Sequence, residues 1–92
     1  MQEANYKVPG GKLLKVKLSV SSNQITQLTI LGDFFLHPED TIEKIEEALI
    51  GCTLDENMLK KKIDTVLKEN ESILVGASSS DIVKVILIAS SN

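Results

Sequence analysis

Hydrophobic and polar residues alternate along the first third of the chain, and this period of two predicts β-strands. From Lys12 onward, apolar side chains point to one side while lysines and a serine point to the other. The alternation resumes over residues 25–31 after the turn-forming segment 21–24, so the two strands are predicted to form an antiparallel hairpin. Residues 6–8 predict an edge strand that stops at Pro9. The inward-facing residues are Leu14, Val16, Leu18 and Val20 on the first strand of the hairpin and Leu28 and Ile30 on the second.

Apolar residues recur every three or four positions in the next part of the chain, which predicts two amphipathic helices. The first helix is predicted to begin with Asp40 and Glu43 as a capping box and to end at Gly51. The second begins at Thr53 or Asp55. The short connection predicts that the helices lie antiparallel against one face of the hairpin. Their apolar stripes are Ile42, Ile45, Ala48 and Leu49, then Leu59, Ile63, Val66 and Leu67.

The last part of the chain, residues 82–88, is rich in β-branched residues and fits either a third helix or a further strand. The preceding cluster of three serines and Asp81 is typical of a helix N-terminus. We therefore predict a helix that is apolar on nearly every side and lies between the sheet and its neighbours, or between this chain and another.

These elements predict an α+β fold in which a small antiparallel sheet packs against two to three helices, with residues 1–92 forming a single domain. The core must be aliphatic, because tryptophan is absent and the aromatic residues are Tyr6, Phe34 and Phe35. A chain of this size buries only about 60–65% of its unfolded surface. Exposed apolar area is therefore costly, and a partner chain is expected.

Charge and composition argue against several classes of function. The net charge is −3, and all ten basic residues are lysines. Without arginine, recognition of nucleic acid and an autonomous ATP site are both disfavoured. The single cysteine fits a reducing compartment. The sequence shows neither a signal peptide at its start nor an apolar run long enough to span a membrane, so we expect a cytoplasmic protein without membrane contact.

Few residues are candidates for chemistry. The run Gly10-Gly11-Lys12 lacks the remaining residues of a phosphate loop and is predicted to be a turn. His37 is the single histidine and has no partners for metal binding or catalysis. Cys52 follows a helix-ending glycine beside an acidic helix, which favours a buried structural thiol over a reactive one.

The segment Gly32-Asp33-Phe34-Phe35 joins the strand-like half of the chain to the helix-like half. Asp33 is predicted to bond backbone N–H groups in an Asx-type turn rather than to act in catalysis. The two phenylalanines are adjacent, so one can fill the core while the other contacts a neighbouring chain. We expect this joint to be a contact point.

The order and spacing of three segments resemble the C-terminal accessory domain of lipoate–protein ligases. These segments are residues 9–13, the strand at 25–31 with its continuation to Phe35, and residues 49–52 followed by Met58-Leu59. The resemblance spans about residues 6–67. In that family the domain usually follows a catalytic domain on one polypeptide, whereas a separate domain resembles the small subunit of the two-chain, mostly archaeal, ligases. The family's fold is shared with iron–sulfur scaffold and sulfur-acceptor proteins.

The resemblance implies a non-catalytic subunit of a heterodimer that is needed for ATP-dependent formation of lipoyl-adenylate. Lipoate, ATP and magnesium are then expected on the catalytic subunit, which also transfers the lipoyl group to a carrier protein. This chain is expected to bind no cofactor. The hypothesised partner interface consists of Gly11, Lys12, Gly32, Asp33, Phe34 and Phe35. The alternative is a sulfur-transfer or iron–sulfur assembly protein that uses Cys52, although a lone thiol suits a cluster scaffold badly.

Overall fold

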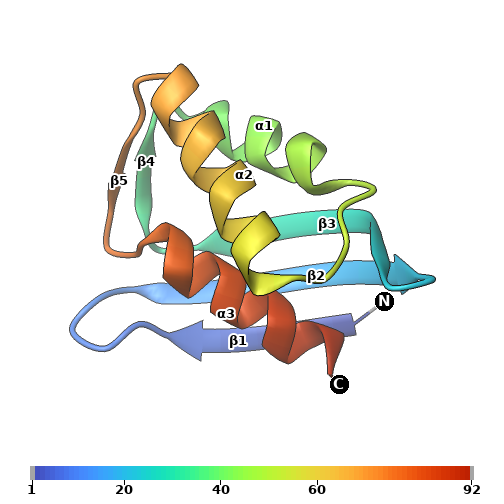
Figure 1. The fold of residues 1–92 in the computed structure, drawn as a ribbon. Helices are drawn as coiled ribbons and strands as arrows, with labels where there is room; N and C mark the ends of the chain where they lie inside the picture. The colour runs from blue at the N-terminus through green and yellow to red at the C-terminus, as the bar shows by residue number, and fades with distance from the viewer. Residues whose placement is uncertain (1, 92) are drawn as a thin grey trace.

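Three antiparallel strands form the main sheet in the computed structural model, which describes residues 2–91 (Figure 1). They are β1 (Gln2–Lys7), β2 (Leu13–Ser21) and β3 (Gln24–Gly32), in the order β1-β2-β3. The predicted hairpin is confirmed as β2 and β3. Ser22 and Asn23 connect these strands with φ values of 52° and 62°, as a two-residue turn between right-twisted strands requires. The predicted edge strand is β1, which begins earlier than the alternating segment.

Three helices cover one face of this sheet (Figure 1). They are α1 (Thr41–Leu49), α2 (Glu56–Glu69) and α3 (Ser79–Ser90). Helix α3 lies against β1 and β2, and α1 lies against β3. Helix α2 packs chiefly on the other two helices, so the prediction that both central helices lie against the hairpin is right for α1 alone. The α+β architecture is confirmed.

The C-terminal apolar run is the predicted helix rather than a strand. The Ser78 side chain accepts a hydrogen bond from the backbone N–H of Asp81 at 3.3 Å, and the Asp81 carboxylate accepts one from the backbone N–H of Ser78 at 2.9 Å. This reciprocal capping box satisfies N–H groups that the first turn leaves free. Because α3 packs against both the sheet and α2, residues on several of its sides are buried: Ile82, Val83, Val85, Ile86 and Ala89.

The helix starts differ in how they are capped. The Asp55 side chain accepts a hydrogen bond from Met58 N–H at 3.0 Å, so Asp55 rather than Thr53 caps α2. The predicted capping box at Asp40 is wrong, because that side chain makes no capping bond. Its backbone is already near-helical, with φ −69° and ψ −7°, whereas a side-chain cap needs an extended residue. Gly51 adopts a positive φ of 82°, as predicted for the end of α1.

The outer edge of β3 is closed by α1 and the segment that follows it. The backbone N–H of Ile30 donates to the Glu46 carboxylate at 2.7 Å. Farther along, Ile25 exchanges backbone hydrogen bonds with the α1–α2 connection, at 3.0 Å to the Cys52 carbonyl and 2.7 Å from Gly51 N–H. These bonds occupy edge groups that would otherwise be open to strand addition.

A second, smaller sheet was not predicted. It consists of β4 (Phe35–His37) and β5 (Ile73–Val75), which pair antiparallel at one end of the molecule (Figure 1). The inward side chains Leu36 and Leu74 join the core beneath it. None of the helices within residues 2–91 has the length and hydropathy that crossing a bilayer requires.

Candidate partner-docking interface

Three loops that are distant in sequence meet beside the small sheet. The backbone N–H of Lys12 donates to the Gly76 carbonyl at 3.1 Å, and the Asp33 N–H donates to the Leu13 carbonyl at 3.0 Å. A Cβ atom added to Gly11 would lie 2.6 Å from the Gly76 carbonyl oxygen, so these two loops approach too closely for a side chain. The structure therefore brings together all the residues of the hypothesised interface: Gly11, Lys12, Gly32, Asp33, Phe34 and Phe35.

Gly32 sits at the tightest point of this junction. A Cβ atom there would lie 2.3 Å from the Leu13 carbonyl oxygen and 2.9 Å from the Phe34 ring. Gly32 also pairs with Leu14 across the β2–β3 ladder, so the backbone has little freedom to withdraw. A residue without a side chain is needed here because the β3 backbone, the β2 backbone and an aromatic ring converge.

The two phenylalanines point to different sides, as predicted. Phe34 is half-buried and packs against the core. Phe35 is 56% exposed, and its ring lies parallel to that of His37 with the ring centroids 6.3 Å apart. That Phe35 contacts a neighbouring chain stays a prediction.

Strand β5 adds two exposed apolar side chains that sequence reasoning missed. Phe35 is opposite Val75 and His37 is opposite Ile73, so all four side chains lie on one face of the small sheet. We call these four residues the β4–β5 outer face. The signal in the sequence was the short run Ile73-Leu74-Val75 before Gly76, but three residues are too few to establish a period.

Asp33 does not form the predicted Asx-type turn. Within the described residues, its carboxylate accepts no backbone hydrogen bond, and the bond at this position runs from its own N–H to Leu13. The ladder interaction between the two strands extends one residue past Gly32 and holds the turn instead. Asp33 is exposed beside the junction.

The loop containing Gly10, Gly11 and Lys12 is the predicted turn. Gly11 N–H donates to the Val8 carbonyl at 2.8 Å, and Val8 N–H donates to the Lys12 carbonyl at 3.0 Å. Gly10 has a positive φ of 69°. The loop's carbonyl and N–H groups are thus used to close the turn and to join Gly76.

Cys52 is buried, with 6% of its surface exposed, as predicted for a structural thiol. Residues 2–91 contain no group of three or more histidine, cysteine, aspartate or glutamate side chains placed to hold a metal ion. The Cys52 carbonyl accepts a hydrogen bond from the Ile25 N–H on the edge of β3, and the Cys52 thiol faces the core.

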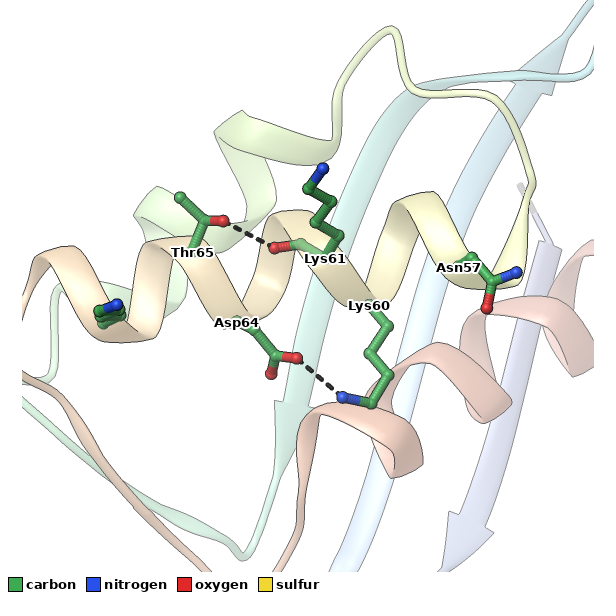
Figure 2. A pocket seen from close by; sticks show the side chains of 6 residues that line it. Asn57, Lys60, Lys61, Asp64 and Thr65 are labelled. Carbon is green, nitrogen blue, oxygen red and sulfur yellow. Dashed lines mark hydrogen bonds and ion pairs between the residues drawn. The ribbon is translucent and has the colours of Figure 1, made fainter.

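An open hollow of about 350 Å³ lies along the solvent side of α2 (Figure 2). Its polar groups are largely bonded to one another: Lys60 Nζ lies 2.8 Å from the Asp64 carboxylate, and Thr65 Oγ1 donates to the Lys61 carbonyl at 2.8 Å. Lys60, followed by the Ser79 hydroxyl, lowers the pKa of Asp64. These internal contacts indicate a solvated helix face rather than a ligand site. The hollow is lined by Asn57, Lys60, Lys61, Asp64, Thr65 and Lys68.

The fold is a small α+β domain whose smaller sheet has an exposed apolar face. The chain belongs to the family described as the bacterial lipoate protein ligase C-terminus, whose model matches residues 3–86. The match includes most of α3, which lies beyond the segments that carried the resemblance in the sequence.

Both comparisons with known proteins lead to Thermoplasma acidophilum. The chain is 29% identical to lipoate-protein ligase A subunit 2, and the alignment covers 96% of this chain and 89% of that protein. It also superposes on a chain from a structure of an archaeal lipoylation system, described as a bipartite lipoate protein ligase and its E2 lipoyl domain. That superposition has a TM-score of 0.79 at 28% identity and covers 94% of each chain. Both alignments therefore cover nearly the whole of this chain, and the superposition shows that the fold is shared.

Proposed function

We propose that this chain is the non-catalytic accessory subunit of a two-chain lipoate–protein ligase. With a separate catalytic subunit, it is required for ATP-dependent activation of lipoate to lipoyl-adenylate in protein lipoylation. The observation that carries the proposal is the near full-length match to subunit 2 of a lipoate-protein ligase. The chemistry of its own residues agrees, because the glycine-lysine loop is a closed turn and the buried cysteine faces the core.

Lipoate, ATP and magnesium are bound by the catalytic subunit in this proposal, and the lipoyl carrier protein is served indirectly. The accessory subunit acts by binding the adenylation-competent conformation of the catalytic subunit more tightly than the incompetent one. Differential affinity of this kind shifts the population toward the competent state without any group of the accessory chain entering the reaction. The complex works in the cytoplasm.

The proposal predicts that pyrophosphate release depends on both chains. We expect the catalytic subunit alone and this chain alone to give background release with lipoate, ATP and magnesium, and the mixture to give a large lipoate-dependent rate. An enzyme-coupled pyrophosphate assay measures this, with an unrelated acidic protein of similar size replacing this chain as the control. Equal rates with and without this chain would contradict the proposal.

Replacement of Cys52 separates this function from sulfur transfer. We expect Cys52→Ala to retain at least about half of the stimulation of pyrophosphate release, because the thiol is buried and removal of a small side chain costs only about 1 kcal/mol of folding free energy. A circular-dichroism melt establishes that the variant is folded. Complete loss of activity in a folded variant would favour the thiol chemistry instead.

A further inference from the structure

We infer that the β4–β5 outer face is the surface that docks on the catalytic chain, and that it fits an apolar patch bordered by basic side chains. The inference rests on the function proposed above and adds to it the location and the chemistry of the contact. It begins from the face defined by Phe35, His37, Ile73 and Val75.

This face holds the three most exposed large apolar side chains of the described chain. Ile73 is 58% exposed, and Phe35 and Val75 are each 56% exposed. The cross-strand register places Phe35 directly opposite Val75, with Ile73 two residues farther along β5, so the three side chains are neighbours. The other large apolar residues with substantial exposure come from different elements: Leu13, Leu31, Ile50, Met58 and Ile88. A contiguous apolar cluster anchored by an aromatic ring is typical of the centre of a protein interface.

The face is held in place before any partner binds. Below it, Leu36 and Leu74 pack toward the core, and beside it the Lys12–Gly76 bond joins the β1–β2 loop to the end of β5. The close approach at Gly32 fixes the entry into β4. A preorganised face loses little conformational entropy on association, so its apolar area contributes efficiently to affinity. In Figure 1 the small sheet lies at the end of the molecule away from the start of β1 and the end of α3.

One border of the face is acidic. Glu39 and Asp40 follow β4, and Glu71 precedes β5. The hydroxyls of Thr41 and Ser72 lie 2.9 Å apart and tie these two segments together, so the carboxylates gather at the His37–Ile73 end. Asp40 is partly neutralised by Lys44, whose Nζ lies 3.9 Å away, whereas Glu39 and Glu71 have no ion pair among the described residues. The complementary surface is therefore basic beside its apolar centre.

The same charges argue against a second copy of this chain as the occupant. The chain carries a net charge of −3 and has no arginine. Two copies would approach against like-charge repulsion, and the acidic border would gain no arginine partner. The catalytic chain of the two-chain ligase therefore occupies this face.

The first test uses exposed apolar residues on and off the face. We expect Phe35→Ala to raise the Kd for the catalytic subunit about 30-fold and Val75→Ala to raise it by about 5-fold or more, as central interface residues do. Leu31→Ala and Met58→Ala are the matched controls, since these side chains are 47% and 49% exposed but lie elsewhere. Their Kd values are expected to stay within about twofold of wild type. Titration calorimetry gives each Kd, and thermal melts show that all four variants are folded.

The second test examines the acidic border. We expect Glu39→Lys to lower the association rate constant at least about threefold at low salt, with the difference disappearing near 1 M salt. Glu47→Lys, which makes the same charge change on the exposed side of α1, is the control. An unchanged rate constant for Glu39→Lys would overturn the basic character assigned to the partner.

Calorimetry and pyrophosphate release distinguish the possible failures. If the wild-type chain stimulates release while Phe35→Ala and Val75→Ala bind like the two controls, the docking surface is elsewhere and the proposed function stands. If the wild-type chain binds without stimulating pyrophosphate release, the proposed function fails. The Kd values of the four variants still show whether the β4–β5 outer face is the docking surface. Absence of wild-type binding overturns both. A homodimer in sedimentation that Phe35→Ala dissociates would assign the face to a second copy and overturn the inference.

Discussion

Leu59→Ala is expected to lower the free energy of unfolding by about 3 kcal/mol, within the range for truncating a buried leucine. Leu59 is fully buried on α2, the helix that packs on both α1 and α3. Removing its side chain leaves a cavity where the helices meet, and neighbouring aliphatic residues refill such cavities only in part. A domain of this size is stable by roughly 5–10 kcal/mol, so a large fraction of the total stability is lost.

Met58→Ala is the matched control, since Met58 is the preceding residue on the same helix and is 49% exposed. Methionine and leucine have similar helix propensities, so the two variants differ chiefly in burial. We expect urea unfolding to place Met58→Ala within about 0.5 kcal/mol of the wild type. Thermal melts should show that the Tm of Leu59→Ala is lower than that of the wild type by roughly 12–24 °C. Equal losses in the two variants would mean that α2 does not bury the predicted stripe.

The helices and the main sheet were predictable because their patterns are local. A period of two over β2 and β3 requires one buried face, and the i, i+4, i+7 spacing on α2 requires one buried stripe. Leu59, Ile63 and Val66 are buried as that spacing predicts, and Leu67 packs at the margin of the core. The serine cluster decided between helix and strand for α3, since capping depends on a few adjacent residues.

The small sheet was not predictable, because neither of its strands carries a pattern of its own. Each has three residues, and α1 and α2 separate the two strands in the sequence, so their pairing depends on how these helices are placed. The hydrogen bond from the Ile30 N–H to the Glu46 carboxylate was not predictable either, because it depends on where α1 crosses the edge of β3. Tertiary placement rather than local preference decides such features.

The candidate interface was predictable only in part. The sequence predicted a role for Phe35, because two phenylalanines follow a glycine and an aspartate there in a chain with so few aromatic residues. It could not reveal Ile73 and Val75, which share the face through the β4–β5 register. Nor could it show that Gly11 and Lys12 reach the joint by way of Gly76, since no local spacing encodes a contact between three loops.

Gly32→Ala is expected to lower the free energy of unfolding by about 3 kcal/mol and also to weaken docking on the catalytic subunit. The added methyl group would lie 2.3 Å from the Leu13 carbonyl oxygen, which already accepts the Asp33 N–H bond. Since the Leu14–Gly32 pairing fixes the ladder on that side, the clash must be relieved toward Phe34 and the start of β4. The β4–β5 outer face would move with it.

Gly51→Ala is the control for Gly32→Ala. It measures the cost of placing alanine in a glycine's backbone conformation when no steric clash is present. Gly51 has a φ of 82°, but a Cβ atom there would meet nothing within 4 Å, so we expect a loss of about 1 kcal/mol with unchanged affinity for the catalytic subunit. Urea unfolding and titration calorimetry on both variants measure the two quantities at a temperature where each is folded. If Gly32→Ala and Gly51→Ala have the same free energy of unfolding and the same affinity for the catalytic subunit, the joint tolerates a side chain and does not position β4. If Gly32→Ala alone loses affinity while folded, the junction of the two sheets sets the orientation of the docking face.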